Sequence, residues 1–590
     1  MEILDHYLTL RMHFSADQTS VTVAELESLF FCTKRNVNLL LRRMSEEEWI
    51  TWTPGRGRGN RSTVEFHYPL EEAAHTHFSK LLQRNQMSEA ADFLTRPLPK
   101  HIAKQLQKKI QSNFGFQVKE TVAESLDLLK IPVRSVISTL DPAFSFTATE
   151  AHFVRQVFDT LIIHNPVTKQ FEPHLAHHWT INETFTEWTF YLRKGVRFHH
   201  GRTLCAKDVV YTLNRLCDEN VNSPYRDLFS IIESIEAFHD TAVYVKLSSP
   251  NAFFLHYLSS YHAPILPYDV PIAPDKSLIG TGAFYVKTHN ERVLALEAFH
   301  DHFMGRPLLD RVEAWFMNVN PERVFHYELP GRETQNKRHV RIDHNGSHYL
   351  IFNFQVDGPH HDRYLREALH AIINRKKLVD DLGGRRRLPG NSFWQARSME
   401  HEFAMVSPEA IAQLLEQSQY NGEPLILCCA QHTENLREAR WLQAELRRYK
   451  IPLTIVPCAP SQFATMDAHL FLKGEILERD AHYGFLTFLK SQQTMRALML
   501  PQHIETIDTL LEPFLRTNDE ERRERITIEI EHYINREKLI LHLYHGARQW
   551  YYPSPLAGIR LNDYGWADFK KLWIQPERYE EVRAGQGGGA

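Results

Sequence analysis

The chain has 590 residues, more than one compact core usually holds, so we expect roughly two to four domains. Hydrophobic residues make up 43% of the sequence and charged residues 24%, which is ordinary for a globular protein and excludes a long disordered polymer. The 68 Lys and Arg residues against 72 Asp and Glu residues give a net charge of −4. This balance excludes a uniformly basic nucleic-acid coat but leaves room for one local basic face.

The cysteines and the first residues bear on the cellular compartment. Six cysteines are scattered along the chain without any CxxC pair, which predicts a reducing environment and no disulfide scaffold. The start, Met1–His6, lacks the basic and apolar regions of a secretory signal, and no apolar stretch reaches the ~20 residues of a membrane helix. We therefore expect a cytoplasmic protein with no membrane partner.

Two short helices are predicted near the start of the chain. Thr22–Glu25 has the form of a capping box, in which the Thr and Glu side chains each bind a backbone amide at the helix start. Phe31-Cys32 then gives a tight connection, and Thr33 can cap the next helix. In that helix an apolar stripe of Val37, Leu40, Leu41 and Met44 lies opposite Arg35, Asn38 and Arg42. Two such helices in close succession are typical of a helix-turn-helix.

A β-hairpin with a basic tip is predicted next. Trp49–Thr53 and Ser62–Tyr68 are rich in β-branched and aromatic residues, as strands are, and Gly55–Arg61 joins them. Glycines at the tip allow a close approach to phosphates, and its arginines supply charge to the DNA backbone or minor groove. The tip nearly matches GxGxxG, but Asn60 replaces the last glycine and no helix follows, so we predict no nucleotide site here.

Charge is polarised along this region, because residues 34–61 carry a net charge of +4 and residues 1–33 a net charge of −4. A helix-turn-helix followed by a basic hairpin describes a winged helix that binds double-stranded DNA. The alternative is a small helical domain with a solvated basic loop. The predicted DNA-binding residues are Thr33, Lys34, Arg35, Asn36, Asn38, Arg42, Arg43, Arg56, Arg58, Asn60 and Arg61.

Residues 71–130 are interpreted as a helical extension and linker. Glu71–Arg84 and His101–Ser112 both have helical patterns, and the proline-containing segment Thr95–Pro99 separates them. The stretch can carry dimer contacts or serve only as a spacer, so a homodimer is left open.

Ordered motifs follow from residue 131 onward. They are Thr139–Pro142, Glu172–Trp179, Thr189–Gly201, Ala206–Arg215, Ile279–Val286 and Leu365–Arg375. Together they resemble the oligopeptide- and dipeptide-binding class of ABC-transporter solute-binding proteins, with Ala283 where proline is usual. The resemblance implies two lobes, with lobe I at 131–350 plus 540–590 and lobe II at 351–539. Crossing strands near Ile351–Phe354 and Leu539–Leu543 would form the hinge.

The N-terminal segment joined to such a receptor resembles the SgrR-like transcriptional regulators, which fuse a winged helix to a solute-binding domain. The expected fold class is therefore multidomain: an α+β winged helix-turn-helix at 1–70, the linker at 71–130, and a two-lobed α/β domain of the periplasmic-binding-protein type (type II).

The solute is expected between the lobes. The resemblance points to the loop Pro389–Trp394, so Phe393 and Trp394 are the aromatic candidates, although a core position for Trp394 stays open. Asp480 follows the strand Leu470–Leu472, roughly where peptide receptors carry an acid that binds an amine. Because Arg479–Gly484 departs from that motif, peptide specificity is not carried over.

Other chemistry is not indicated. The sequence has 34 histidines but no HExxH pattern and no Cys/His zinc spacing, so we predict no metal and no cofactor. Cys428 and Cys429 lie in an apolar strand and are predicted to be buried thiols on opposite faces. No GxSxG motif, P-loop or convincing carboxylate pair indicates an enzyme.

The predicted function is a ligand-responsive transcription regulator. Its partners would be double-stranded DNA and a small solute effector (a sugar, a sugar phosphate or a peptide-like molecule). The first alternative is a receptor that delivers solute to an ABC transporter. The second is a solute store or interaction module whose N-terminal domain binds protein.

Overall fold

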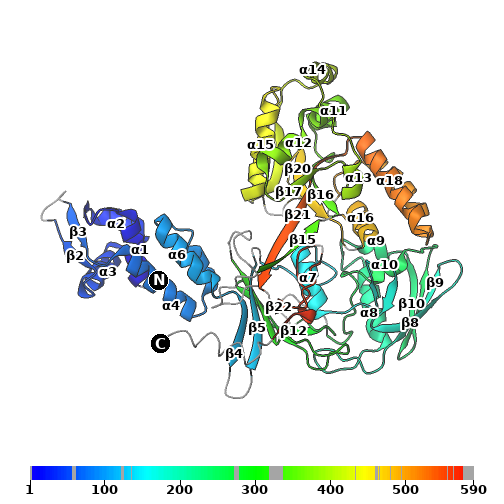
Figure 1. Cartoon of the computed structure of the whole chain (residues 1–590), viewed down its shortest axis with the longest axis horizontal. Helices are drawn as coiled ribbons and strands as arrows, with labels where there is room; N and C mark the ends of the chain where they lie inside the picture. Colours follow the sequence, from blue (N-terminus) through cyan, green and yellow to red (C-terminus); the bar gives the residue numbers. More distant parts are fainter. Residues whose placement is uncertain are drawn as a thin grey trace, which may run out of the picture. The chain divides into compact units, whose positions relative to one another are not determined.

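The computed structural model divides the chain into two compact units (Figure 1). Unit 1 comprises Met1–Val136, Lys287–Leu296 and Asp310–Lys337, and unit 2 comprises Ile137–Val286, Glu297–Leu309 and Arg338–Ala590. The structure describes residues 3–55, 61–120, 125–133, 136–270, 278–317, 337–343, 345–431, 433–458, 463, 466–478, 480–492, 495–553, 556–562 and 564–575.

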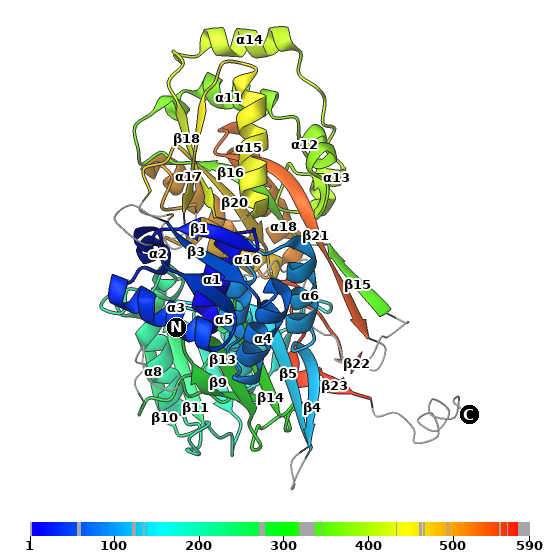
Figure 2. The ribbon, with the colours of Figure 1, turned by 90° about the vertical axis from the view of Figure 1, so that its left-hand side faces the viewer.

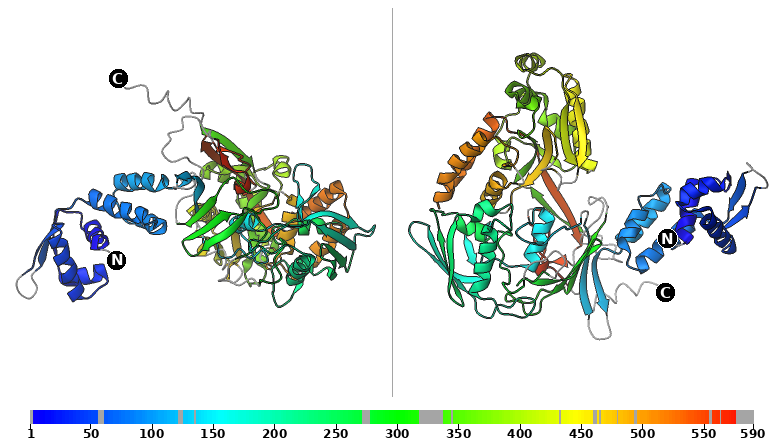
Figure 3. Two further views of the ribbon diagram at one scale, coloured as in Figure 1. Left: turned by 90° about the horizontal axis from the view of Figure 1, so that it is seen from below. Right: turned by 180° about the vertical axis from the view of Figure 1, so that it is seen from behind.

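Unit 1 starts with short helices and strands that share one core. They are α1 (Ile3–His13), β1 (Gln18–Val21), α2 (Val23–Phe30), α3 (Lys34–Glu46), β2 (Ile50–Thr53) and β3 (Ser62–Phe66). The strands form an antiparallel sheet in the order β1-β3-β2, which Figure 3 shows beside the helices. Tyr7, Leu26, Leu41 and Val64 are buried in the shared core. The predicted helices and hairpin are present, whereas α1 and β1 are additional.

Three helices and a hairpin follow in the segment expected as an extension and linker. They are α4 (Leu70–Gln83), α5 (Met87–Phe93), α6 (Lys100–Gln111), β4 (Gly115–Glu120) and β5 (Ser125–Val133). The two predicted helices correspond to α4 and α6. Phe78, Phe93 and Leu106 are buried in the same core as the winged helix, so this segment is more than a spacer.

A five-stranded sheet ends this part of the chain. Its order is β12-β13-β14-β5-β4, and β14 runs parallel to β5 with Val312 opposite Leu129. The three strands from later in the chain are β12 (Phe284–His289), β13 (Val293–Ala298) and β14 (Arg311–Phe316). Residues far downstream therefore complete a sheet that the hairpin β4–β5 begins.

The first part of unit 2 contains a four-stranded antiparallel sheet, β10-β11-β9-β8. In β9, Trp188, Phe190 and Leu192 are buried and alternate with less buried residues. The elements of this part are α7 (Ala148–Val157), β6 (Ile162–His164), β7 (Phe171–Pro173), β8 (Ala176–Ile181), β9 (Glu187–Leu192), α8 (Ala206–Cys217), α9 (Arg226–Phe229), β10 (Ile232–His239), β11 (Ala242–Leu247) and α10 (Phe254–Leu258).

The second part of unit 2 is built on a sheet of seven strands. Its order is β15-β21-β16-β20-β18-β19, and β17 pairs with β21. The strands are β15 (Lys337–Asp343), β16 (Gly346–Phe352), β17 (Arg386–Pro389), β18 (Leu425–Ala430), β19 (Leu453–Cys458), β20 (Leu470–Ile476) and β21 (Ile540–Pro553). In the antiparallel pair of β16 and β21, Ile351 lies opposite Ile540, and the lobe boundaries expected near 350 and 540 fall in these two strands.

Helices pack around this sheet, and α15 lies against β18 and β19 (Figure 2). The helices are α11 (Arg363–Ile372), α12 (Arg375–Leu382), α13 (Gln395–Met399), α14 (Pro408–Gln417), α15 (Thr433–Arg447), α16 (Ala481–Lys490), α17 (Pro501–Arg516) and α18 (Glu520–Arg536). Near the C-terminus β22 (Leu556–Ala557) pairs with β23 (Trp573–Ile574). There Trp566 stacks on His152 of α7, a helix of the segment expected as the first lobe.

The cysteine prediction is partly wrong. Cys428 is bonded to Cys458 in a disulfide, and only Cys429 is a free buried thiol in this strand. Cys428 lies on β18 and Cys458 on the neighbouring parallel strand β19, with their Cα atoms 6.7 Å apart, a separation that a disulfide can span. The sequence did not reveal that these two strands are neighbours.

Candidate nucleic-acid interface and ligand pocket

Helix α3 separates an apolar inner face from a basic outer face. Val37, Leu41 and Met44 are buried and Leu40 is half-buried, which confirms the predicted stripe. The outward side chains are Lys34, Arg35, Asn36, Asn38, Leu39, Arg42 and Arg43, all of them exposed. Thr33 precedes the helix at the N-cap position and is also exposed, although its side chain makes no capping hydrogen bond.

The turn before α3 is tight because α2 ends abruptly. The capping box at Thr22 and Glu25 starts α2 as predicted, and Leu26 and Phe30 bury its inner face. Phe31 then adopts the left-handed conformation with φ of 49°, and its amide closes the helix on the carbonyl of Glu27. This reversal places the start of α3 four residues after the end of α2. The pair has the connectivity of a helix-turn-helix.

The hairpin after α3 is formed by β2 and β3, with Ile50 opposite Phe66 and Thr53 opposite Thr63. Of the residues predicted at its tip, Arg56, Arg58 and Asn60 lie outside the described residues. Arg61 begins the return of the chain to β3, is exposed, and pairs with Glu25 at 2.6 Å.

Two of the arginines in this region already have acidic partners. Arg42 pairs with Glu46 one turn along α3 at 2.7 Å, and Arg61 pairs with Glu25. The hydrogen bond from the backbone of Thr22, together with Arg61, holds the pKa of Glu25 below its usual value. Water screens exposed pairs of this kind and they contribute little to stability, so a phosphate can displace the carboxylates.

A pocket of about 230 Å³ lies within unit 2. Five aromatic side chains line it: Phe146, Tyr225, Tyr261, Phe488 and Tyr564. Its polar lining consists of Thr147, His262, Glu475, Glu478, Thr487 and Ser491. Most of these residues come from the start of α7, the loop after α10, the end of β20 with the residues just after it, and α16, while Tyr225 precedes α9 and Tyr564 lies near the C-terminus. Both expected lobes therefore contribute to its walls.

Two polar contacts join the expected lobes at the pocket. Arg155 of α7 donates to Glu478 at 2.5 Å, and Nδ1 of His262 lies 2.7 Å from the hydroxyl of Tyr483. Burial lowers the pKa of His262 well below its usual value, so its imidazole is neutral at pH 7. Burial also raises the pKa of Glu475 to about 7.

Two family models match the chain. A model described as the N-terminal part of sugar transport-related sRNA regulators matches residues 2–117. The model of bacterial extracellular solute-binding proteins, family 5 (middle part), matches residues 170–493, which is more than half of the chain. The chain belongs to family 5 of the solute-binding proteins.

Relatives with both parts give the same domain order. The chain is 25% identical to the HTH-type transcriptional regulator SgrR of Pectobacterium atrosepticum, over 97% of this chain and 98% of that protein. It is 28% identical to the uncharacterized protein YhjP of Bacillus subtilis, over 97% of this chain and 100% of that protein. The family-5 protein is thus an SgrR-like transcription regulator with a solute-binding domain, as the motifs predicted.

Solved structures agree on the fold of the solute-binding domain. A dipeptide-binding protein from a Pseudoalteromonas species, in complex with Met-Leu, matches with a TM-score of 0.66 and 20% identity over 75% of this chain and 100% of that chain. AgaA from Agrobacterium tumefaciens, in complex with agropinic acid, matches with a TM-score of 0.64 and 18% identity over 77% and 100%. The predicted fold class is confirmed. Among the described residues of the SgrR-like regulator, no helix has both the length and the apolar character needed to cross a membrane.

Phe393 and Trp394, the aromatic candidates for the ligand, are buried behind the pocket and do not line it. The ring of Phe393 packs 4.7 Å from that of the pocket residue Phe488, and Trp394 packs on Phe485 of the same helix, α16. Trp394 is also covered by the guanidinium of Arg397 at 3.9 Å. The two side chains therefore shape α16 from the core side.

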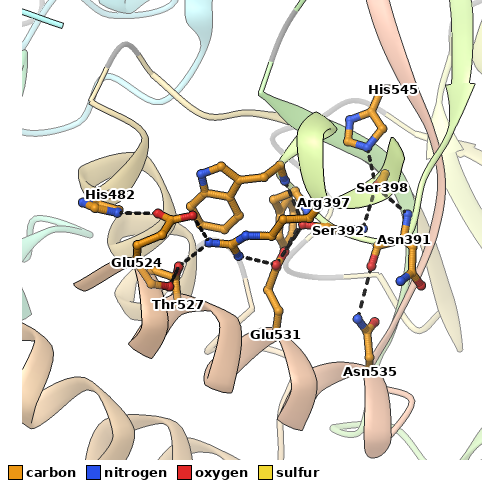
Figure 4. Close-up of polar contacts among 12 residues, drawn as sticks. Asn391, Ser392, Arg397, Ser398, His482, Glu524, Thr527, Glu531, Asn535 and His545 are labelled. Carbon is orange, nitrogen blue, oxygen red and sulfur yellow. Dashed lines mark hydrogen bonds and ion pairs between the residues drawn. The ribbon is translucent and has the colours of Figure 1, made fainter. Parts of the chain in front are cut away.

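A buried carboxylate fixes this loop, as Figure 4 shows. Glu531 of α18 accepts hydrogen bonds from the hydroxyl of Ser392 and the amide of Phe393, each at 2.8 Å, and from Arg397 at 2.5 Å. Arg397 also reaches Glu524, at 2.6 Å. The loop that the family resemblance placed at the ligand is thereby held in the core by polar contacts.

Asp480 lies in an ionic network. Its carboxylate accepts from the amide of Tyr483 at 3.1 Å, which caps α16, and it contacts Nδ1 of His256. His164 lies 3.7 Å away, and the donor atoms of the three side chains all fall within 4.8 Å of one another, as a metal site requires. Arg523, however, donates to Nε2 of His256 at 3.1 Å, so Nδ1 carries the proton and faces Asp480. This arrangement gives Asp480 and His256 hydrogen-bond partners, whereas the buried Nδ1 of His164 has none among the described groups.

The pocket residues themselves were not among the sequence predictions. They come from separate segments around residues 147, 225, 262, 475, 487 and 564, none of which forms a local motif. One residue of the sequence could have indicated the pocket: Gly484, which lines it together with Thr487 and Phe488, one turn further along α16. A Cβ at Gly484 would lie 2.9 Å from the backbone of Glu478, so this glycine lets α16 approach the end of β20.

Proposed function

We propose that this SgrR-like regulator binds double-stranded DNA through α3 and the β2–β3 hairpin, and that a small solute in the pocket of unit 2 controls it. The outward face of α3 carries the first part of the proposal. A helix that buries one stripe and exposes a continuous basic and amide face has the form of a recognition helix. We place this activity in the cytoplasm, where the DNA is.

The side chains on that face suit both kinds of DNA contact, those to base edges and those to phosphates. Arg35 and Asn38 have the bidentate groups that read guanine and adenine edges in the major groove, respectively. Lys34, Arg42 and Arg43 have the charge that binds phosphates, as does Arg61 at the hairpin. Thr33 and Asn36 lie at the N-terminal end of α3, the end that enters the groove. Arg56, Arg58 and Asn60 of the hairpin tip remain part of the proposal from the sequence.

The pocket supports the second part of the proposal. Aromatic walls with a few converging polar groups are the usual composition of a small-molecule site. The ligand candidates from the sequence support the pocket indirectly through α16, which lines it. Phe393 and Trp394 pack on this helix, and Asp480 caps it. A transport receptor would need the same pocket, but the outward basic face of α3 has no use in that role.

DNA binding by the full-length protein tests the proposal. Fluorescence anisotropy with a labelled duplex from the region flanking its own coding sequence, against a scrambled duplex, measures specific affinity. We expect R35A/N38A to lose at least tenfold in affinity for the specific duplex. The control R440A/R447A removes two exposed arginines from α15 and should leave the affinity unchanged. Equal affinity of the protein for the two duplexes would favour the protein-binding or storage alternative.

A further inference from the structure

The charge of the pocket lining is one-sided. Glu475 and Glu478 line it, whereas no lysine or arginine is among the described residues that do. Arg155 binds Glu478 at 2.5 Å and so offsets one of the two negative charges. The remaining basic group of the lining, His262, is neutral at pH 7 because burial lowers its pKa. Burial raises the pKa of Glu475 to about 7, so this wall disfavours even one negative charge, and an anionic ligand would meet the same burial with no lysine or arginine among the described residues of the lining.

The helix start at the pocket does not supply an anion site either. Thr147 and Ala148 line the pocket at the N-terminus of α7, where free amides would attract a phosphate. The capping box occupies several amides here: the carboxylate of Glu150 accepts from the amides of Phe146 and Thr147 at 3.0 and 2.9 Å, and the hydroxyl of Thr147 accepts from the amide of Glu150 at 3.2 Å. Glu150 is buried and adds its own negative charge at this end of the helix. The local capping box therefore works against an anion.

The same lining suits an uncharged hydroxylated molecule. Aromatic faces offer apolar surface to the C–H face of a ring, and carboxylates accept hydrogen bonds from hydroxyl groups. Thr487 and Ser491 add hydroxyl groups on α16. The volume of about 230 Å³ is below the ~300–1,000 Å³ of drug-sized sites, which fits a single sugar ring.

We propose that the pocket binds an uncharged polyhydroxylated ligand of about one sugar ring and rejects the phosphate ester of the same sugar. The inference rests on the proposed function, since it takes the pocket of unit 2 as the sensor site. A phosphate ester carries roughly −1.5 to −2 charges at pH 7, and the burial that disfavours the charged form of Glu475 would disfavour those charges as well.

Calorimetry and thermal shift on the full-length protein test the selectivity with matched pairs. The probes are D-glucose, D-mannose, D-fructose and N-acetyl-D-glucosamine, each with its 6-phosphate, and D-glucosamine as the cationic member. We expect at least one free sugar to raise the melting temperature, and its phosphate to bind at least tenfold more weakly. A phosphate that binds as tightly as its free sugar, a tenfold preference for glucosamine over glucose, or no response to any free sugar would each overturn the inference.

Variants connect the selectivity to the residues. Glu475→Gln should lower the affinity for the free sugar severalfold and reduce the preference of the pocket for the free sugar over its phosphate. Glu512→Gln changes an exposed carboxylate on α17 and should change neither. If Glu475→Gln fails to fold, Thr487→Val is the second variant. It removes a pocket hydroxyl at nearly constant volume and should also lower the affinity for the free sugar severalfold. Full sugar affinity in the folded pocket variants would overturn the assignment. DNA affinity measured in parallel separates the two proposals, since intact DNA binding with failed selectivity leaves the proposed function standing.

Discussion

Single buried polar and charged side chains connect elements of the solute-binding domain. Glu531 connects α18 to the loop before α13 by binding Ser392, Phe393 and Arg397 at once. Breaking a buried pair by removing one partner leaves an uncompensated charge, which is more damaging than the pair itself is favourable. His256 has a comparable position, between Asp480 and Arg523.

Glu531→Ala should lower the free energy of unfolding of the solute-binding domain by about 3–5 kcal/mol, because Arg397 then loses its most buried partner. Urea denaturation followed by tryptophan fluorescence measures the change. Glu512→Ala is the matched control, since its pair with Arg516 is exposed and should contribute about 0–1 kcal/mol. Similar losses in the two variants would contradict the role given to Glu531.

Acid should destabilise this domain in a defined window. Burial lowers the pKa of His256 from 6.5 to about 4, so the unfolded state binds a proton more readily than the folded state. Stability is therefore fully present above pH 6.5 and falls as the pH is lowered towards 4. Asp480, Arg523 and His164 are the charged and titratable groups around it. Urea midpoints at pH 7.5, 6 and 5 check this, and a flat profile would refute it.

Elements differ in how far the sequence predicted them. Helix α3 was predictable because its apolar stripe has a helical period, and α2 because Thr22 and Glu25 form a capping box. Helix α1 was missed because its buried residues include Asp5, so its sequence shows no clear polar face. Strand β1 was missed because Val21 is its one fully buried residue, so its sequence shows no alternation of buried and exposed residues. Strand β1 depends on its pairing with β3, a tertiary contact that no local pattern contains.

The division of α3 into two faces gives a prediction within one helix. Leu41→Ala removes a buried side chain and should lower the free energy of unfolding of unit 1 by about 2–5 kcal/mol, with loss of DNA binding near the new melting temperature. Leu39→Ala, on the exposed face, should change it by less than about 0.5 kcal/mol. Thermal unfolding of both variants measures the difference, and equal effects would contradict the orientation of α3.

Over the whole molecule, the winged helix and the two-lobed domain were predictable from motifs, whereas the pocket was not. The motif residues are mostly scaffold: Asp208, for instance, binds Arg202 and caps α8. The pocket lining depends on how distant segments of the two lobes meet, which no local motif contains. The family resemblance pointed to Phe393 and Trp394 as ligand contacts, but in the structure both are core residues. A regulator of this design also needs the solute to favour one DNA-binding state over another.

That coupling is reciprocal, which makes it measurable from both ends. The free sugar that gives the largest thermal shift should change the DNA dissociation constant by roughly 5–150-fold at saturation, and the duplex should change the sugar affinity by the same factor. Anisotropy titrations with and without the sugar, and calorimetry with and without the duplex, measure the two factors. A DNA affinity that is unchanged at saturating sugar would reject solute control.

The salt dependence of DNA binding tests the central claim most directly, because it counts the phosphate contacts that α3 makes. The slope of log K against log [salt] is about −0.9 for each neutralised phosphate. We predict that K34A/R35A/R43A flattens this slope by about 2–3, while R440A/R447A leaves it as in the wild type. An unchanged slope in the α3 variant, with the fold intact, would show that this basic face does not contact DNA.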